Sequence, residues 1–486
     1  MRPLMVLGCT SDAGKSLIAT ALCAWFARRG VDVAPFKGQN MSNNARVVAG
    51  PSGSGEIGVA QWLQAKAAGV VPDVRMNPVL LKPEADTASQ VVVLGHVDHE
   101  LSRLRWEERH DALWTPMADS VDALRNDHEL VIIEGAGSPA EINLRDQVNH
   151  RVLTHTDAAG LLVSDIDRGG SFAHLYGTWA LIPDEVRQRL AAFVLNRFRG
   201  DASLLAPGPE RLSELTGMAD AGVMPMLQHR LPREEGAAEL APLESVDSSG
   251  SVTRVVLPRI PFGSNLDEFH LLATVADVSW ATSKSAFEQL RADDGVIVLP
   301  GSKHVAADTR WMGERGIDRA IIAAADRGVR VIGVCGGAMM LGTSFADPFG
   351  LEGRSTAGGD PVSVLGLVDV ATELGAEKLV QDTEVTIEMA AGSVVTGGYE
   401  IRLGRVEGEA PVAGRATDGS AVAWTGGAAR PHVIATTVHG LFEDPSFVET
   451  VIGRRPEPVL EQTFEQLADA VEEHLDTALL LRLVEA

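Results

Sequence analysis

A chain of 486 residues is too long for one hydrophobic core and, at about 150 residues per domain, predicts two to four domains. Its formal net charge of −24 argues against nucleic acid or an anionic membrane as a partner, because phosphate groups would be repelled, and favours small-molecule substrates. The three cysteines exclude a disulfide scaffold and a cysteine-based metal site, and the apolar runs are too short for a signal peptide or a membrane span, so a cytoplasmic protein is expected.

The first predicted element is a short strand over residues 5–7 that runs into a phosphate loop and then a helix. Backbone N–H groups of such a loop cradle phosphates, while Lys15 reaches the terminal phosphates and Ser16 offers its hydroxyl to Mg²⁺. The strict motif has a glycine six residues before the lysine, where this chain has Cys9, and Gly8 lies one residue further back. We therefore expect an ATP site formed by the loop residues Gly8, Thr10, Asp12, Gly14, Lys15 and Ser16.

A second strand is expected over residues 31–36, and it ends in the polar segment 37–44. Ligands of α/β sheets bind at the carboxyl ends of the strands, which is where this segment falls. Gln39 and Asn40 are therefore candidate substrate contacts, with an ordinary asparagine-rich turn as the alternative.

The chain after this polar segment is expected to return to regular structure. Residues 53–69 are interpreted as a helix that carries Glu56, Gln61 and Gln64. An apolar run over residues 91–95 predicts another strand.

The apolar strand predicted over residues 130–134 ends in a carboxylate, Glu134, and continues as Gly-Ala-Gly. This is the setting of the acidic residue that holds Mg²⁺ opposite a phosphate loop. Glu134 and Ser16 are therefore the expected metal-associated residues.

A further apolar strand over residues 161–164 delivers three charged residues to one sheet edge. Asp165, Asp167 and Arg168 are candidate substrate contacts, with a solvated charged turn as the alternative. The next strand leads into Asn196, whose amide is placed to contact the base of ATP. Strands that alternate with helices in this way predict a parallel sheet covered on both faces.

The second half begins after residues 229–250, which are rich in Glu, Pro, Ala and Ser and are interpreted as a linker. Strands are expected over residues 252–260 and 295–299. A helical pattern with an acidic face occupies the C-terminal end of the chain.

Residues 333–337, Gly-Val-Cys-Gly-Gly, have the form of a nucleophile elbow with Cys335 where hydrolases carry serine. Small neighbours permit the strained turn, and the N-terminus of the following helix favours a thiolate. A buried structural cysteine in a glycine-rich turn is the alternative.

A cysteine nucleophile needs a base, and the best-placed histidine is His439, at the end of the strand expected over residues 433–438. Gly301 and Gly336 are expected to supply backbone N–H donors for an oxyanion. The third member of such a site is not evident from the sequence, and Glu443 is one candidate.

Together these motifs closely resemble the cobyric acid synthase family over nearly the whole chain. The first half is also similar to dethiobiotin synthetase, whose phosphate loops place the leading glycine seven residues before the lysine, as Gly8 is here. The second half is similar to class I glutamine amidotransferases. The segments that carry the resemblance are residues 8–16, 35–41, 76–83, 134–144, 167–170, 196–200, 299–303, 333–337, 398–400 and 439–442.

The resemblance implies an α/β chain in which each of two domains is a mostly parallel sheet flanked by helices. The expected boundaries are a P-loop synthetase domain over 1–228, the linker 229–250, a class I glutamine amidotransferase domain over 251–453 and a helical tail over 454–486.

The implied reaction is amidation of the b, d, e and g carboxylates of adenosylcobyrinic acid a,c-diamide to adenosylcobyric acid. ATP, Mg²⁺, the corrinoid and glutamine are the implied cofactors and partners. Cys335 and His439 would release ammonia from glutamine for attack on an acyl phosphate formed at the ATP site. Lys15, Ser16 and Glu134 would hold MgATP.

Two departures from the related families bear on this expectation. Relatives usually carry an aromatic residue and then Gln behind the elbow glycines, whereas this chain has Ala338 and Met339, so weaker glutamine binding is expected. Many class I amidotransferases have Glu two residues after the histidine, where this chain and the cobyric acid synthases have no acid; here the residue is Leu441.

Two alternative functions stay open. The a,c-diamide synthase acts earlier on the same ring, but it typically presents an aspartate-bearing loop where this chain has Gln39, Asn40 and Met41. A regulatory ATPase of the partitioning type usually carries an additional lysine in its loop, where Thr10 and Ser11 stand here.

Overall fold

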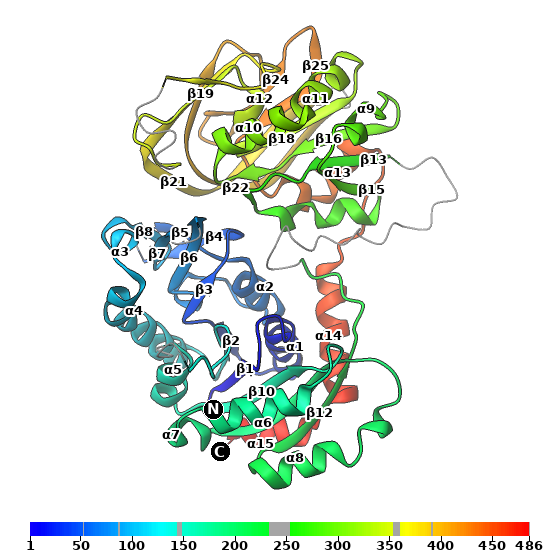
Figure 1. Ribbon diagram of the computed structural model, residues 1–486. Helices are drawn as coiled ribbons and strands as arrows, with labels where there is room; N and C mark the ends of the chain where they lie inside the picture. The colour runs from blue at the N-terminus through cyan, green and yellow to red at the C-terminus, as the bar shows by residue number, and fades with distance from the viewer. Residues whose placement is uncertain are drawn as a thin grey trace. The chain divides into compact units, whose positions relative to one another are not determined.

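The computed structural model describes residues 1–51, 53–85, 88–142, 148–232, 253–352, 360–389 and 392–485. Residues 233–250 of the expected linker and residue 252 of the strand expected behind it lie outside this part. The chain forms two compact units (Figure 1). Unit 1 contains Met1–Ser42, Val48–Leu231 and Val459–Ala486, and unit 2 contains Asn43–Val47 and Pro232–Pro458.

The centre of unit 1 is a parallel sheet in the order β12-β11-β10-β1-β9-β2. Alternate residues of a strand point to opposite faces, so Leu4 and Val6 join one apolar cluster while Met5 and Leu7 join another. Both faces are thus buried, which explains the continuous apolar runs of these strands. The strands are β1 (Leu4–Gly8), β2 (Val33–Phe36), β9 (Leu130–Glu134), β10 (Ala159–Asp165), β11 (Leu190–Phe198) and β12 (Ala219–Pro225).

Helices cover both faces of this sheet (Figure 1). The face of Leu4 and Val6 packs against α1, α2, α14 and α15, and the opposite face packs against α4, α5, α6 and α8. The helices of unit 1 are α1 (Lys15–Arg28), α2 (Val59–Ala67), η1 (Val74–Met76), α3 (His99–Arg103), α4 (Trp106–Asp127), α5 (Asn149–Thr156), α6 (Ser171–Leu181), α7 (Asp184–Arg187), η2 (Ala202–Leu205), α8 (Gly208–Thr216), α14 (Leu460–His474) and α15 (Thr477–Glu485).

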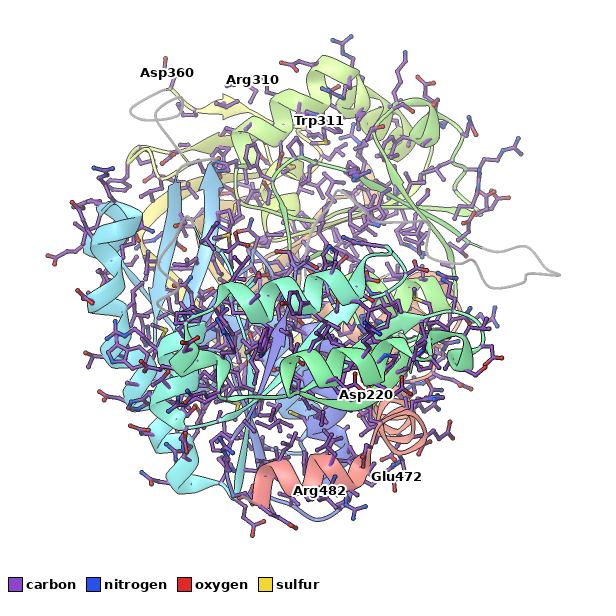
Figure 2. The ribbon with its side chains drawn as sticks, turned by 60° about the horizontal axis from the view of Figure 1, so that its bottom comes forward. Asp220, Arg310, Trp311, Asp360, Glu472 and Arg482 are labelled. Carbon is purple, nitrogen blue, oxygen red and sulfur yellow. The ribbon has the colours of Figure 1, made fainter. Side chains whose placement is uncertain are left out.

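The two C-terminal helices are part of the core of unit 1. The fully buried Trp25 of α1 donates from Nε1 to the carboxylate of Glu472 on α14 at 2.5 Å. Figure 2 labels Glu472 on α14 and Arg482 on α15, at the lower edge of the view. The N-terminus is joined to α15 through the Arg2 N–H, which donates to the Val484 carbonyl at 2.8 Å.

A second, small sheet of unit 1 has the order β3-β6-β7-β8. Its strands are β3 (Gln39–Met41), β6 (Val79–Ala85), β7 (Ala88–Val93) and β8 (His96–Asp98). The polar segment expected as a loop therefore begins as a strand, because β3 pairs in parallel with the apolar β6. Gln39 and Asn40 are buried on it.

The interpretation of residues 53–69 as one helix is wrong in its first part. β5 (Gly53–Gly58) precedes α2 and pairs with β4 (Ala45–Gly50), so Glu56 lies on a strand. Glycine disfavours a helix interior, and a Cβ at Gly55 would lie 2.9 Å from the Cα of Gly95, which leaves no room for a side chain.

Unit 2 has a mixed sheet in the order β15-β13-β16-β18-β25-β24-β23-β21-β19-β20, with β22 paired to β21. Five neighbouring strands of this sheet, β15, β13, β16, β18 and β25, run parallel. Strands β24, β23, β21 and β22 extend the sheet in antiparallel pairs. Two α/β units with parallel sheets confirm the predicted fold class. The antiparallel extension adds to the parallel part that the sequence pattern indicated.

The strands of unit 2 are β13 (Arg254–Pro258), β14 (Gly263–Ser264), β15 (Asp277–Ala281), β16 (Gly295–Leu299), β17 (Gly301–Ser302), β18 (Arg330–Val334), β19 (Ser344–Ala346), β20 (Val362–Ser363), β21 (Val370–Met389), β22 (Gly392–Gly408), β23 (Val412–Ala416), β24 (Ala421–Gly426) and β25 (Arg430–Thr436). Its helices are η4 (Leu266–Thr274), α9 (Ser285–Glu288), α10 (Val305–Arg315), α11 (Ile317–Asp326), α12 (Gly336–Leu341), η5 (Leu441–Glu443) and α13 (Pro445–Ile452). Among the described residues of both units, no helix has the length and apolar character needed to cross a bilayer.

Candidate active sites

The phosphate loop connects β1, which ends at Gly8, with α1, which begins at Lys15. Gly14 has a φ of 95°, a left-handed conformation that favours glycine. The Nζ of Lys15 lies 3.3 Å from the Thr10 carbonyl oxygen, so the lysine folds back over the loop. Asn196, at the end of β11, donates from Nδ2 to the Ala13 carbonyl at 3.0 Å. The structure therefore brings together five of the residues expected at the ATP site, namely Gly8, Thr10, Gly14, Lys15 and Asn196.

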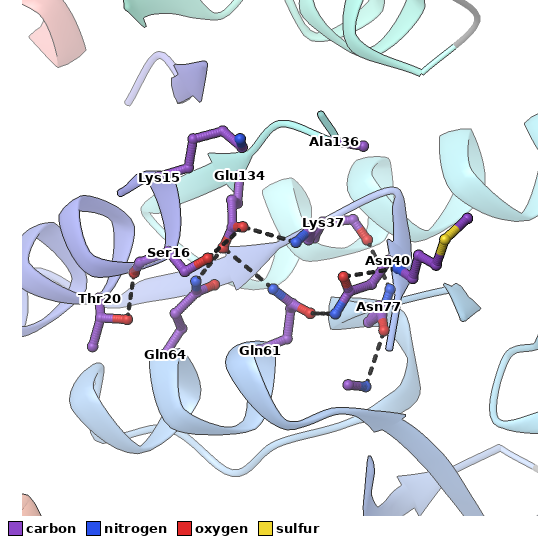
Figure 3. A network of polar contacts seen from close by, with 12 residues as sticks. Lys15, Ser16, Thr20, Lys37, Asn40, Gln61, Gln64, Asn77, Glu134 and Ala136 are labelled. Carbon is purple, nitrogen blue, oxygen red and sulfur yellow. Dashed lines mark hydrogen bonds and ion pairs between the residues drawn. The ribbon is translucent and has the colours of Figure 1, made fainter. Parts of the chain in front are cut away.

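Glu134, at the end of β9, accepts hydrogen bonds from helices α1 and α2 and from Lys37, the residue after β2 (Figure 3). Its Oε1 accepts from Ser16 Oγ at 2.9 Å and from Lys37 Nζ at 2.8 Å. Its Oε2 accepts from Gln64 at 2.5 Å and from Gln61 at 3.4 Å. Glu134 and Lys37 are both buried, so the carboxylate and the ammonium neutralise each other away from bulk water.

The same network reaches one of the expected substrate residues. Asn40 on β3 donates from Nδ2 to Gln61 Oε1 at 3.1 Å, and Gln61 in turn contacts Glu134 (Figure 3). Asn77 holds the neighbouring backbone, because its Nδ2 donates to the Lys37 carbonyl at 3.2 Å. A chain of side-chain amides thus joins β3 to the carboxylate beside the phosphate loop.

An ionic cluster joins the phosphate loop to the ends of β10 and β11. The pairs are Asp12–Arg197 at 2.8 Å, Asp12–Arg168 at 2.6 Å, Asp165–Arg197 at 3.0 Å and Asp167–Arg199 at 3.1 Å. Hydrogen bonding to Arg197 is the main reason that the pKa of Asp12 lies below its usual range. Of the residues expected at the substrate, Asp165 here bonds Arg197 of β11 and Arg168 bonds Asp12 of the phosphate loop, and Arg197 was not anticipated.

The oxygen atoms near the phosphate loop suit Mg²⁺, a hard cation that prefers carboxylate and hydroxyl oxygens. Ser16 Oγ and Glu134 Oε1 are adjacent, and the buried Gln64 Oε1 has no hydrogen-bond partner among the described residues. The described residues contain no group of three or more His, Cys, Asp or Glu side chains placed to hold a metal. Mg²⁺ needs no such cage, because it is commonly bound by one or two protein oxygens together with phosphates and water.

The second site is built on the elbow between β18 and α12. Cys335 has a φ of 50° and a ψ of −107°, which a non-glycine residue seldom adopts. Its N–H donates to the Thr436 carbonyl at 2.7 Å, which ties the elbow to the neighbouring parallel strand β25. A Cβ at Gly336 would lie 2.5 Å from the Ser302 nitrogen, so only glycine fits between the elbow and β17.

His439 follows β25 and is buried against Cys335 and Glu268. Its Nδ1 lies 2.9 Å from Glu268 Oε1, and the other carboxylate oxygen accepts from the Gly440 N–H at 2.8 Å. Burial alone would lower the pKa of His439, but the negative charges of Cys335 and then Glu268 outweigh burial and raise that pKa to about 10. The arrangement therefore places an imidazole that is oriented by a carboxylate beside the Cys335 side chain.

Two further contacts fix the imidazole. The ring of Tyr399 stacks on it at 5.4 Å between centroids and 16° between planes, and the two residues exchange backbone hydrogen bonds. A Cβ at Gly301 would lie 2.9 Å from His439 Cε1, so β17 passes directly beside the ring. The structure thus brings Gly301 and Gly336, the expected oxyanion residues, to Cys335 and His439.

The third member of this site differs from the candidate that the sequence suggested. Glu443 bonds Arg46, and it is Glu268 of η4 that holds His439. Burial, opposed by the charge of Arg46, raises the pKa of Glu443 to about 7. The available signal for Glu268 was weak: two adjacent acids, Asp267 and Glu268, in an otherwise apolar stretch.

Comparison with known proteins covers the whole chain. The profile of the CobQ/CobB/MinD/ParA nucleotide binding domain matches residues 4–240, and that of the CobB/CobQ-like glutamine amidotransferase domain matches residues 254–447. The cobyric acid synthase of Variovorax paradoxus (strain S110) is 48% identical over 498 residues, which cover 99% of this chain and 99% of the relative. That of Paracidovorax citrulli (strain AAC00-1) is 48% identical over 493 residues and that of Albidiferax ferrireducens is 46% identical over 497, each covering 98% of both chains. The resemblance inferred from the motifs is thereby confirmed, and the chain belongs to the cobyric acid synthase family.

Proposed function

We propose that this chain amidates the b, d, e and g carboxylates of adenosylcobyrinic acid a,c-diamide to give adenosylcobyric acid, using ATP and taking nitrogen from glutamine. Membership of the family supports a glutamine-using ligase of cobalamin synthesis. The observation that carries the proposal is that one chain contains both a Cys335–His439–Glu268 arrangement and a phosphate loop facing Glu134. Each arrangement supplies half of an amide synthesis.

In unit 2, the Cys335 thiolate attacks the side-chain carbonyl of glutamine, and a C–S bond forms. The N–H groups of Gly301 and Gly336 are proposed to stabilise the oxyanion, and the His439 imidazolium gives its proton to the departing nitrogen, so that the C–N bond breaks and ammonia leaves. Water, activated by the now neutral imidazole, then hydrolyses the thioester to glutamate. Glu268 keeps the imidazole oriented through both steps.

In unit 1, a carboxylate of the corrinoid attacks the γ-phosphate of ATP, which gives an acyl phosphate and ADP. Ammonia attacks the acyl carbon and displaces phosphate, which leaves the amide. Lys15 and the loop N–H groups are proposed to bind the phosphates. Asn196 Oδ1, which is buried without a partner among the described residues, is proposed to accept from the base. Asn40 and Gln39 on β3, with Asp165, Asp167 and Arg168, are the proposed corrinoid contacts.

Mg²⁺ would be held by Ser16 and Glu134, and when bound it supplies positive charge that neutralises the transferring phosphoryl group. Lys37 already lies 2.8 Å from Glu134. The protein therefore contributes a cation of its own to this carboxylate.

Mass spectrometry of the corrinoid after incubation with MgATP and glutamine tests the proposal. New amides at the b, d, e and g positions of the a,c-diamide are expected, whereas amides added only to the a and c positions of cobyrinic acid would identify the earlier synthase. Cys335→Ala is expected to abolish glutamine-dependent amidation and to retain amidation with high ammonia, and Lys15→Ala to abolish both. Full glutamine-dependent activity of Cys335→Ala would refute the assignment of the nucleophile.

A further inference from the structure

Residues Asn43–Val47 belong to unit 2, although the chain on both sides of them belongs to unit 1. Only Ser42 separates them from β3, the strand of Gln39 and Asn40. The segment is held by the Ala45 N–H, which donates to Asn265 Oδ1 at 2.9 Å, and by the buried side chain of Arg46. A piece of the first half of the sequence is thereby part of the amidotransferase unit.

Among the described residues of unit 2, the guanidinium of Arg46 contacts the side chains of Asp267, Glu443 and Tyr399. Its Nη2 bonds the carboxylates of Asp267 and Glu443. Its Nη1 donates to the hydroxyl of Tyr399 at 2.9 Å, and the guanidinium carbon lies 5.3 Å from the centroid of that ring. Charge-assisted bonds of this kind in a buried setting hold a side chain firmly.

Each partner of Arg46 adjoins a group that positions His439. Asp267 precedes Glu268, which bonds the Nδ1 of His439 at 2.9 Å. Tyr399 stacks on the imidazole at 5.4 Å. Glu443 ends the turn η5, which starts two residues after His439. One side chain therefore ties together three of the elements that surround the imidazole, η4, β22 and η5.

We propose that Arg46 is a positioning residue for the glutaminase, through which the placement of residues 43–47 sets the orientation of His439. This inference rests on the proposed function. Because only Ser42 separates residues 43–47 from the proposed corrinoid-contact strand β3, a shift of that strand on substrate binding is carried by the backbone to Arg46. Glutamine hydrolysis is thereby linked to occupancy of the synthetase site.

Electrostatics explain why the cation matters. Asp267 and Glu268 are buried and the neighbouring Glu443 is partly buried, and the two other acids help to keep the pKa of Glu443 raised, at about 7. Without the guanidinium, repulsion among these carboxylates acts on Glu268 and displaces it from His439. Removal of the Arg46 guanidinium should therefore lower kcat for glutamine hydrolysis rather than raise the glutamine KM.

The test measures glutamate release from glutamine by the full chain with MgATP and corrinoid, and separately amidation with ammonia. For Arg46→Met we expect kcat for glutamate release to fall about tenfold or more while the glutamine KM and ammonia-dependent amidation change less than about threefold. Arg46→Lys should recover part of the lost kcat, and stimulation of glutamate release by MgATP and corrinoid should shrink in both variants. Arg254→Met, which removes the Arg254–Asp294 pair at 3.1 Å elsewhere in unit 2, is the matched control and should leave every rate unchanged.

Tyr399→Phe keeps the ring on His439 and removes only the hydroxyl that accepts a hydrogen bond from Arg46. This variant therefore tests the positioning role of Arg46 even if Arg46→Met does not fold. We expect its kcat for glutamate release to fall about threefold at constant KM. A wild-type kcat in this variant, or in folded Arg46→Met, overturns the inference and leaves the proposed function intact. A wild-type chain that releases no glutamate overturns both.

Discussion

The Nδ1 of His439 lies 2.9 Å from Oε1 of Glu268, and the second oxygen of this carboxylate accepts from the Gly440 N–H at 2.8 Å. Both oxygens of Glu268 therefore form hydrogen bonds with the adjacent residues His439 and Gly440. The carboxylate cannot rotate without losing one of these two bonds. The imidazole consequently presents its Nε2 edge to the nucleophile in a single orientation.

Glu268→Gln is expected to lower kcat for glutamine hydrolysis by about 10²-fold to 10⁴-fold, because an amide nitrogen facing Nδ1 selects the wrong tautomer. Glutamine KM and ammonia-dependent amidation should change little, since neither depends on the imidazole. Steady-state glutamate release measures the effect. Glu288→Gln, which removes an exposed partner of Lys284, is the control, and a Glu268→Gln kcat within about twofold of wild type would contradict the role.

The raised pKa of His439 predicts a pH-dependent contribution to stability. The imidazole titrates near 6.5 in the unfolded chain and at about 10 in the folded protein, so between these values the folded state holds the extra proton. The contribution is fully present below pH 6.5 and is lost as the pH rises through about 10. Denaturant midpoints of wild type and His439→Gln should therefore converge as the pH is raised from 6.5 to 10; a constant difference would show that the imidazole has an ordinary pKa.

The parts of these sites that follow strands were predictable from the sequence. Carboxyl ends of neighbouring parallel strands meet at one sheet edge, so the residues after β1 and β9, and those after β18 and β25, had to come together. Ser16 and Glu134 form one such pair, and Cys335 and His439 form the other. The family resemblance rested on the same strand-end motifs.

Other parts were not predictable because they depend on distant pairing. Glu268 and His439 are 171 positions apart, and Arg46 and Glu443 are 397 positions apart, with no motif around Glu268 or Arg46. Lys37 was part of a recognised motif, but its ion pair with Glu134 joins the end of β2 to the end of β9. Neither the sequence around Lys37 nor that around Glu134 indicates this pair by itself. Tertiary contacts of this kind become visible only once the sheet is assembled.

Met339→Gln is expected to lower the glutamine KM about fivefold, the value of one neutral hydrogen bond, by restoring the amide that relatives carry behind the elbow. Met339 is buried against Gly404, since a Cβ at Gly404 would lie 2.6 Å from its Cε and 3.0 Å from Cγ2 of Thr372. The Oγ1 of Thr372 is buried without a partner among the described residues, so a new amide has an acceptor and the variant should stay folded. Initial-rate kinetics give the KM; Met339→Leu is the control, and an unchanged KM in Met339→Gln would exclude the hypothesis.

Glu134→Ala tests whether the buried pair with Lys37 serves stability as well as nucleotide binding. Removing one partner of a buried ion pair leaves the other charge desolvated, so the free energy of unfolding should fall by about 3–5 kcal/mol. Lys37→Met combined with Glu134→Ala removes both charges and should recover much of that loss, because methionine fills the space of the lysine stem. Urea unfolding measures this recovery.

Neither variant should bind MgATP as wild type does, because Ser16 Oγ, 2.9 Å from Glu134 Oε1, loses its carboxylate partner in both. Calorimetric titration with MgATP and, separately, with ATP in EDTA separates the Mg²⁺-dependent part of the nucleotide affinity from the metal-independent part. We expect the Mg²⁺-dependent part of the affinity to vanish in both variants and the metal-independent part to survive in the more stable double variant. Restored Mg²⁺-dependent binding in the double variant would show that Glu134 acts only as the counter-charge of Lys37.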